Sequence, residues 1–350
     1  MDGPSRTHDP DSDRDWIRRP RPRHHGAGLV GLRRPDRLHG APAHLEDLAA
    51  TGLVKKLLAY FGFRFAAAIF GAFPESWMRH TGEWLGRRGA ARRSDKRPLL
   101  RGHMRRVMGP DKTEAEIETA VDRMYESYGR YWAETFWLRP RRHQAVSRRV
   151  ERIGFEHVFK AMDEGNGIIF ALPHLGSWEV AGLIADEIGA RVLAVAEDLP
   201  NERITAWFVA IRNQLGIDIV LTTDPQRRSK LIRTLKEGKV IALLADRDVT
   251  GSGLTTEFFG EETKMPAGPV GLAILTGAAL IPVGVYFKKG AGHRIEVHAP
   301  IEIPELETRD QTVEAGAALM AGKLEEIISR DPTQWHLFQP NWPSDVGYRA

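Results

Sequence analysis

The residues best suited to chemistry in this sequence are a histidine and an acid, His174 and Glu179, separated by Leu-Gly-Ser-Trp. A histidine is the side chain that most readily accepts a proton near neutral pH. A carboxylate on its second ring nitrogen would fix the tautomer and stabilise the imidazolium that forms. Because this spacing is not that of one helical face, a turn must bring the two side chains together. The alternative interpretation is a loop histidine and a solvated helical glutamate.

A second cluster, Ala245-Asp246-Arg247-Asp248, directly follows the apolar run Val240 to Leu244. His174 likewise follows the apolar run Ile168 to Leu172. Short apolar runs of this kind are typical of buried parallel strands, and parallel strands place their carboxyl ends at one edge of a sheet. We therefore expect the cluster to form one wall of a cleft that also contains His174. An arginine between two acids can also be neutralised locally and serve only structure.

The elements that must position these residues alternate between strand-like and helix-like patterns after Gly167. The strand-like runs are Ile168–Leu172, Val192–Ala196, Ile217–Leu221, Val240–Leu244, Leu280–Phe287 and Arg294–His298. The helix-like runs are Glu179–Ile188, Arg203–Leu215, Gln226–Glu237, Pro269–Thr276 and Val313–Ser329. This alternation predicts an α/β fold: a mainly parallel twisted sheet flanked by helices.

The region before the sheet is predicted to be helical, and the first residues to be disordered. Residues 1–50 are rich in Arg, Asp, Pro and His and lack a hydrophobic period, which indicates a solvated tail; nucleic-acid binding is the alternative for its basic run Arg18 to His25. Leu53 to Trp84 has an amphipathic helical pattern that Pro74 interrupts. We expect a single domain over residues 51–345, with a helical part at 51–145 and an α/β part at 146–345.

Two further features of the helical part each allow two interpretations. The basic run Arg87 to Arg106 could lie on anionic lipid headgroups or be a solvated connector with a basic helix. Thr113 and Glu116 form a capping box for a helix whose aromatic stripe is typical of a packed core, with a ligand groove as the alternative.

Composition excludes several classes of protein. The chain has 350 residues, 42% of them hydrophobic and 27% charged, with a net charge of +4 and no cysteine. Disulfides, thiolate metal sites and a cysteine nucleophile are therefore excluded. The sequence contains no phosphate-binding P-loop, no G-x-S-x-G nucleophile elbow and no H-E-x-x-H, and we expect no metal site. Pro266 to Phe287 is long and uncharged, but its prolines and glycines favour a buried helix and strand over a membrane span.

Four sequence blocks carry a resemblance to a known superfamily. HLGSWE, from His174 to Glu179, resembles the histidine, four residues, acid motif of the glycerolipid and lipid A type acyltransferases. The later blocks ADRDVTGSG, FFGEETKMPAGPVGLAILTGAALIPV and QWHLFQPNW resemble the actinobacterial phosphatidylinositol mannoside acyltransferases. The similarity extends from about Leu53 to Asp345. Two positions depart from the family pattern, with Glu179 in place of the commoner Asp and Asp246 in place of Glu.

The resemblance implies transfer of a fatty acyl chain from acyl-CoA to a mannose hydroxyl of a phosphatidylinositol mannoside. It implies His174 as the base and Glu179 as the residue that orients it. Substrate-binding roles fall to Arg212, Asp246, Arg247 and Asp248. Acyl-CoA would be a co-substrate, with no further cofactor. The expected partners are a membrane glycolipid and the anionic inner membrane, contacted peripherally from the cytoplasmic side, and no nucleic acid.

The chemistry that these residues allow is direct transfer without an acyl-enzyme, since neither a nucleophile elbow nor a cysteine is present. We expect oxyanion donors in the Leu175–Ser177 turn or at the following helix N-terminus. We expect the helices of Leu53–Leu85 and Thr113–Leu138 to wall an apolar acyl tunnel. The alternatives are a lipid A type or lysophospholipid acyltransferase with another acceptor, a non-catalytic lipid-binding protein, and a hydrolase.

Overall fold

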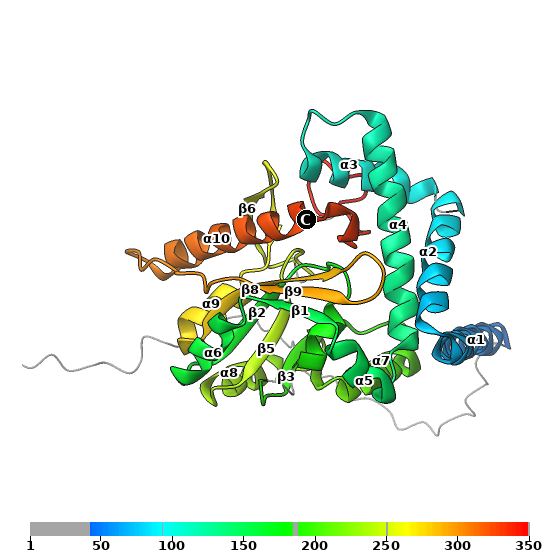
Figure 1. The fold of residues 1–350 in the computed structure, drawn as a ribbon, viewed down its shortest axis with the longest axis horizontal. Helices are drawn as coiled ribbons and strands as arrows, with labels where there is room; N and C mark the ends of the chain where they lie inside the picture. Colours follow the sequence, from blue (N-terminus) through cyan, green and yellow to red (C-terminus); the bar gives the residue numbers. More distant parts are fainter. Residues whose placement is uncertain (1–42, 93, 185–187, 250, 349–350) are drawn as a thin grey trace, which may run out of the picture. The chain divides into compact units, whose positions relative to one another are not determined.

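The computed structural model describes residues 43–92, 94–184, 188–249 and 251–348 (Figure 1). The chain divides into two units, Met1–Thr51 and Gly52–Ala350, and the second carries all the features discussed below. The tail predicted to be disordered covers residues 1–50, and residues 1–42 of it lie outside the described residues. The first helix, α1 (Ala43–Ala72), begins within that predicted tail.

A seven-stranded sheet forms the centre of the second unit, with the strand order β1-β9-β8-β2-β5-β3-β4 (Figure 1). Its strands are β1 (Val150–Ile153), β2 (Ile168–Leu172), β3 (Val192–Ala196), β4 (Ile217–Leu221), β5 (Val240–Leu244), β8 (Ala279–Phe287) and β9 (His293–Val297). All neighbouring pairs are parallel except β8 and β9. The prediction of a mainly parallel sheet flanked by helices is confirmed.

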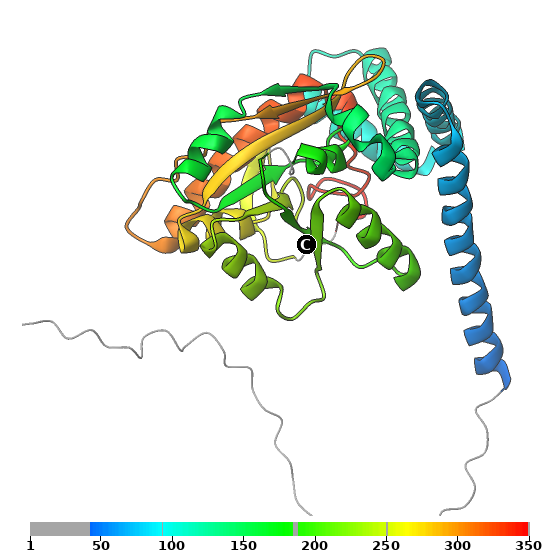
Figure 2. The same ribbon diagram turned by 60° about the horizontal axis from the view of Figure 1, so that its bottom comes forward.

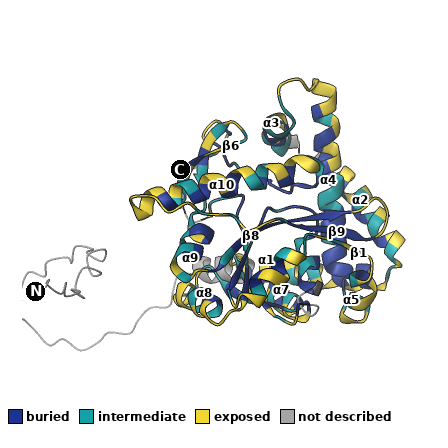
Figure 3. Cartoon of the chain, turned by 60° about the vertical axis from the view of Figure 1, so that its left-hand side comes forward, coloured by how far each residue is buried: buried dark blue, intermediate teal, exposed yellow. Residues whose placement is uncertain are grey.

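Both faces of the sheet are buried, as the continuous apolar runs require. In β2, Ile168 and Leu172 belong to one hydrophobic core, whereas Ile169 and Ala171 belong to the other. The first core is covered by α6 (Glu156–Asp163), the 3₁₀ helix η2 (Trp178–Ile184) and α7 (Glu202–Gln214). The second is covered by α8 (Arg227–Lys236), α9 (Gly268–Thr276) and α10 (Arg309–Arg330). Figure 2 shows the sheet among its helices from a second direction, and Figure 3 shows that its strands are mostly buried.

The elements that the sequence analysis did not predict are short or partly exposed. They are α5 (Pro140–Ser147), β1, α6 and the antiparallel hairpin of β6 (Leu254–Phe258) and β7 (Glu261–Met265). β1 reads Val-Glu-Arg-Ile, and the hairpin alternates buried with exposed residues, so neither has an apolar run. Of the helix expected over Glu179–Ile188, residues 185–187 lie outside the described residues, and the described part up to Ile184 belongs to η2, whose tighter winding matters for the site below.

The helices before the sheet are α1, α2 (Glu75–Arg92), α3 (Arg97–Met108) and α4 (Glu114–Trp137). Pro74 separates α1 from α2 as predicted, and the capping box of Thr113 and Glu116 starts α4. α2 and α4 pack backbone to backbone, because a Cβ atom on Gly129 would lie 2.2 Å from the carbonyl oxygen of Gly82. The short 3₁₀ helices η1 (Ser94–Lys96) and η3 (Pro332–Gln334) complete the described elements.

The later part of the basic run Arg87 to Arg106 forms the basic helix α3, as one of the two interpretations made from the sequence expected. Arg97, Arg101 and Arg105 form salt bridges with acids of α4. Arg87 of α2 pairs with Glu126 of α4, and Arg106 of α3 pairs with Glu261 and Asp345. Much of the positive charge is therefore neutralised within the fold.

Among the described residues, no helix is both long enough and apolar enough to cross a membrane. The apolar stretch Pro266 to Phe287 forms α9 followed by the buried strand β8, as predicted.

Candidate active site

His174 and Asp246 form a hydrogen-bonded pair at the carboxyl edge of the sheet. His174 Nδ1 lies 2.7 Å from Asp246 Oδ1, and the backbone N–H of His174 donates to Asp246 Oδ2 at 3.0 Å. The Asp246 side chain is fully buried, whereas that of His174 is 21% exposed. Because Nδ1 faces the carboxylate, Nε2 is the nitrogen left for a substrate. This arrangement matches a general base held by an orienting acid.

Strand order explains why these two residues meet. β2 and β5 are parallel neighbours, with Leu172 opposite Leu244. The pairing continues past the strands, since the N–H of Ala245 donates to the carbonyl oxygen of Leu172 at 2.8 Å. His174 and Asp246 therefore leave the same edge side by side, as the sequence predicted for that edge.

Asp246 is held as a carboxylate. Burial would raise the pKa of Asp246, but the adjacent His174 and the hydrogen bonds that it receives lower the pKa below its ordinary value. One of these bonds comes from the indole Nε1 of Trp335, which donates to Oδ2 at 2.7 Å. The sequence assigned Asp246 to substrate binding, but the structure places its side chain behind His174, fully buried and outside the cavity lining, with both oxygens accepting hydrogen bonds from the protein.

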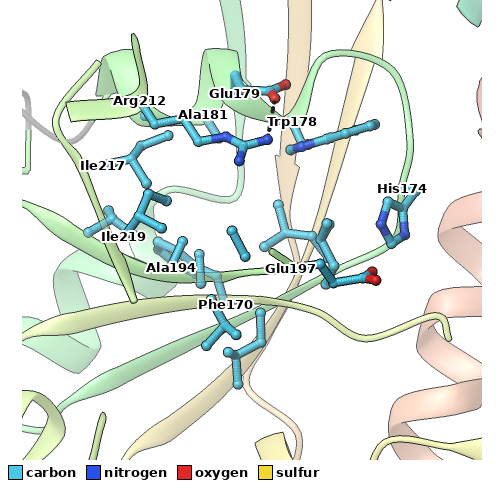
Figure 4. A pocket seen from close by; sticks show the side chains of 18 of the residues that line it. Phe170, His174, Trp178, Glu179, Ala181, Ala194, Glu197, Arg212, Ile217 and Ile219 are labelled. Atoms are coloured by element: carbon cyan, nitrogen blue, oxygen red, sulfur yellow. Dashed lines mark hydrogen bonds and ion pairs between the residues drawn. The ribbon is translucent and has the colours of Figure 1, made fainter. Parts of the chain in front are cut away.

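Glu179 does not orient His174. Its Oε1 accepts the hydroxyl of Tyr131 at 2.8 Å and Arg212 Nη2 at 3.1 Å. Figure 4 shows Trp178 between Glu179 and His174, with the dashed bond from Glu179 running to Arg212. The physical reason is η2, which directs the Glu179 carboxylate away from the histidine, toward α4 and α7. The prediction of a His174–Glu179 pair was wrong in this respect.

Glu179 holds the positively charged side chain of Arg212 beside the site. Arg212 lies in the last turn of α7, with its side chain 22% exposed. Burial would lower the pKa of Arg212, but Glu179 outweighs this and raises it, so the guanidinium stays charged. Burial and the Glu179 carboxylate raise the pKa of Tyr131 well above its ordinary value, so its hydroxyl stays a donor.

A mostly apolar cavity of about 570 Å³ opens beside His174. Figure 4 shows His174 and Glu197 at one side of it and Ile217 and Ile219 at the other. The apolar lining of the cavity comes mainly from the sheet and from the helices α6, η2 and α7, and it includes Phe170, Val192, Ala194 and Phe208. A volume in the range of about 300–1,000 Å³ is typical of ligand pockets.

The origin of this lining differs from the prediction. Of the helices expected to wall an acyl tunnel, the structure brings only Tyr131 and Trp132 of α4 to the described cavity. Most of the remaining wall comes from the sheet, with residues of β2, β3, β4 and β5 among those that line the cavity. The described residues contain no group of three or more His, Cys, Asp and Glu that could hold a metal ion.

Comparison with known proteins places the chain in a family. The model of the bacterial lipid A biosynthesis acyltransferase family matches residues 52–344. The chain is 36% identical to the phosphatidylinositol mannoside acyltransferase of Mycolicibacterium smegmatis over 75% of this chain and 84% of that one. It is 34% identical to the protein of the same description from Mycobacterium tuberculosis, over 71% and 77%. It is 22% identical to the lipid A biosynthesis acyltransferase of Haemophilus influenzae, over 80% and 82%.

The chain belongs to the bacterial lipid A biosynthesis acyltransferase family. It is an acyltransferase, and the resemblance drawn from its sequence is confirmed at this level.

The remaining charged residues of the candidate site lie at the cavity, where the sequence placed them. Arg247 and Asp248 both line it. Arg247 Nη2 donates to Glu197 Oε1 at 2.5 Å, which joins the ends of β5 and β3. Asp248 Oδ2 accepts the N–H of Gly253 at 2.7 Å and so shapes its own loop.

The turn expected to supply oxyanion donors is partly occupied. The N–H of Leu175 donates to Pro173, and that of Gly176 donates to Gln334. Gly176 has a φ of 58°, and a Cβ there would lie 2.3 Å from the oxygen of Val285, so only glycine fits. The prediction was wrong for these two amides. The second location expected for oxyanion donors, the N-terminus of η2, stays a prediction.

The sequence analysis did not single out Glu197 and Trp335 of this candidate site. Glu197 follows β3 at the same edge as His174 and could have been found by the rule that identified Asp246. Trp335 lies far along the chain in a segment without strand or helix periodicity, and its contact with Asp246 has no local sequence signal.

Proposed function

We propose that this acyltransferase moves a fatty acyl chain from acyl-CoA to a mannose hydroxyl of a phosphatidylinositol mannoside, with His174 as general base. The observation that carries the proposal is the His174–Asp246 pair beside an apolar cavity, in a chain similar to two mycobacterial phosphatidylinositol mannoside acyltransferases. The cavity suits the acyl chain, and the charged rim suits polar parts of the substrates.

The mechanism needs no covalent enzyme intermediate. His174 Nε2 takes the proton of the acceptor hydroxyl as its oxygen attacks the thioester carbonyl. The Asp246 carboxylate stabilises the imidazolium. The tetrahedral intermediate then breaks its C–S bond, and the proton on His174 passes to the departing thiolate of coenzyme A. The products are the new ester and free coenzyme A, and His174 returns to its neutral form.

Charged groups at the cavity support recognition of anionic substrates. Arg212 stays cationic through Glu179, and Arg247, which also lines the cavity, pairs with Glu197. A phosphodiester of the acceptor or a phosphate of coenzyme A would be a suitable partner for either guanidinium.

Asp246, which stands where the family pattern has Glu, bonds to His174. We therefore infer that this departure concerns the support of His174 rather than the acceptor sugar.

The test is a transfer assay on the purified full chain. Palmitoyl-CoA is supplied with phosphatidylinositol mannoside, with lysophospholipid, or with no acceptor, and products are identified by mass spectrometry. The variant His174→Ala should abolish transfer, while His80→Ala, at an exposed histidine of α2, should not. Acylation of lysophospholipid alone would keep the mechanism and overturn the acceptor. Free fatty acid without acylated lipid would make the protein a hydrolase.

We further propose that α1 holds the enzyme on the anionic cytoplasmic face of the cell membrane. One side of α1 packs inward, where Phe63 contacts Trp132 and Phe208 at ring distances of 6.0 and 6.1 Å. Other large apolar side chains of this helix are exposed: Leu53, Val54, Leu58, Phe61, Phe65 and Ile69. An exposed apolar helix face of this length is suited to insertion at the level of lipid headgroups.

Unpaired positive charge accompanies that exposed face. Between Gly52 and Ala72 the sequence has two lysines and one arginine but no acid. Near the end of α1, Arg139 donates to the carbonyl of Ala67 and Arg141 to that of Gly71. Burial and the nearby Arg64 and Arg141 lower the pKa of Arg139. Within the described residues, no carboxylate forms a salt bridge with Arg64, Arg139 or Arg141, so an anionic surface would relieve their repulsion.

The membrane proposal is tested by sedimentation with vesicles of phosphatidylcholine, with and without about one-third phosphatidylglycerol. Arg64→Gln/Arg141→Gln should weaken binding to anionic vesicles, and Phe61→Ser/Phe65→Ser should weaken binding to both. The matched control is Arg87→Gln/Arg105→Gln, which removes the same charge from residues that are paired with glutamates of α4. Equal losses in the two arginine pairs would leave only a general charge effect and overturn the assignment to α1.

A further inference from the structure

The segment of residues 334–345 contacts both His174 and Asp246. The N–H of His336 donates to the carbonyl oxygen of His174 at 2.7 Å, and the N–H of Gly176 donates to Gln334 at 2.9 Å. Leu175 and Trp335 form an isolated antiparallel bridge between these two bonds. The loop that carries His174 is therefore hydrogen-bonded to residues 334–336 rather than left free beyond β2.

The side chain of Trp335 reaches the carboxylate behind His174. Its indole is fully buried, and Nε1 donates to Asp246 Oδ2 at 2.7 Å. Asn341 of the same segment donates to the backbone oxygen of Asp246 at 3.3 Å. Without the indole, the buried Oδ2 would keep only the N–H of His174, and the carboxylate plane would lose its second anchor.

The segment is itself fixed from α3. His103 lies with Nδ1 3.2 Å from the oxygen of Leu337 and Nε2 3.1 Å from Asp345 Oδ2. Arg106 donates to Asp345 Oδ1 at 3.0 Å and stacks over Trp342, 4.4 Å from its ring centre. Trp335 also packs against Phe258 and Phe259 of the β6 strand and its turn. These contacts hold the indole in one orientation.

We propose that Trp335 is a positioning residue for the transfer reaction: its indole N–H fixes Asp246, which in turn fixes the tautomer and orientation of His174. The proposal rests on the proposed role of His174 as base. It extends the catalytic unit to three side chains from distant parts of the sequence, at positions 174, 246 and 335.

The chain offers a matched control in the same segment. Trp342 is also fully buried, and its Nε1 donates to a protein oxygen, that of Phe258, at 2.9 Å. Trp335→Phe and Trp342→Phe therefore remove the same side-chain atoms and one indole hydrogen bond each from the same core, to a carboxylate in the first case and to a backbone carbonyl in the second. Only the first touches Asp246. A purely structural role predicts that the two variants behave alike.

The first measurement does not depend on transfer activity. Diethyl pyrocarbonate modifies neutral imidazoles, and mass spectrometry of the peptide that contains His174 gives the rate at each pH. In Trp335→Phe the pH midpoint should move upward, because a carboxylate with one donor fewer holds the Nδ1 proton of the imidazolium more tightly. In Trp342→Phe the midpoint should stay at the wild-type value. Equal midpoints in all three proteins would overturn the proposal.

The second measurement is steady-state transfer with the acceptor that the assay above identifies. Trp335→Phe should lower kcat by about tenfold or more with KM within about twofold, since the bond to a buried charge is lost but the substrate contacts remain. Trp342→Phe should retain kcat. An equal fall in kcat for both variants would overturn the positioning role. If the wild type transfers to no acceptor, the proposed function fails, but the modification experiment still decides the role of Trp335.

Discussion

The imidazole of His174 and the carboxylate of Asp246 lie 2.7 Å apart although 72 positions separate them in the sequence. The nearer acid, Glu179, bonds to Tyr131 and Arg212 instead. The base and its supporting acid therefore come from the ends of two neighbouring parallel strands. Four predictions follow from this arrangement and its surroundings, in addition to the tests given above.

Asp246→Asn should lower kcat by about 10²-fold or more, because an amide does not stabilise the imidazolium that forms during attack. The acidic limb of the pH–rate profile should move to lower pH, since loss of the negative charge makes His174 easier to deprotonate. The measurement is kcat against pH between about 5 and 9. An unchanged limb would mean that Asp246 does not face the titrating group in solution.

Glu179→Gln should leave that acidic limb in place, because Glu179 makes no bond with His174. It should instead lower the free energy of unfolding by about 2–4 kcal/mol, since Arg212 would lose the charge that compensates it. Urea unfolding and the pH–rate profile of the same preparation test both parts. A shift of the limb comparable with that of Asp246→Asn would restore the sequence-based pairing.

Ala194→Phe should shorten the acyl chain that the enzyme accepts. Ala194 lies on β3 in the cavity wall, and a phenyl ring there would fill space that a long chain needs. Transfer from palmitoyl-CoA should fall by about tenfold or more, while transfer from an octanoyl donor is retained. The short donor serves as the control within the same variant. A parallel loss with both donors would indicate damage to the site rather than a shorter cavity.

Asp345→Asn should remove a pH-dependent part of stability. Burial would raise the pKa of Asp345, but bonds from His103 and from the backbone of Asn341 and Trp342 lower it to about 2. The unfolded value is about 3.9. The folded pKa is depressed, so this contribution, about 2–3 kcal/mol, is complete above about pH 4 and is lost as the pH falls toward 2.

Urea unfolding of wild type and Asp345→Asn at pH 6 and pH 2.5 tests this sign. The difference between the two proteins should be large at pH 6 and much smaller at pH 2.5. A difference that does not change with pH would show that the Asp345 contacts stabilise the fold without linkage to its titration.

Local patterns in the sequence were sufficient for much of the fold. The runs that became β2, β5 and β8 are continuous and apolar, and such a run is typical of a strand buried on both faces whatever lies around it. The same reasoning placed His174 and Asp246 at the carboxyl ends of strands. The helix starts at Thr113 and Pro269 also depend on neighbouring residues alone, and both were predicted.

The partner of His174 was decided only by the tertiary structure. Spacing along the chain favoured Glu179, but which acid reaches a histidine depends on strand order, and β5 lies beside β2 while η2 turns Glu179 away. The Trp335–Asp246 bond has the same origin, because it requires a segment after α10 to return to the sheet edge. Hydrophobic period is a property of a few adjacent residues, whereas these contacts depend on how whole elements pack, and no local pattern records that.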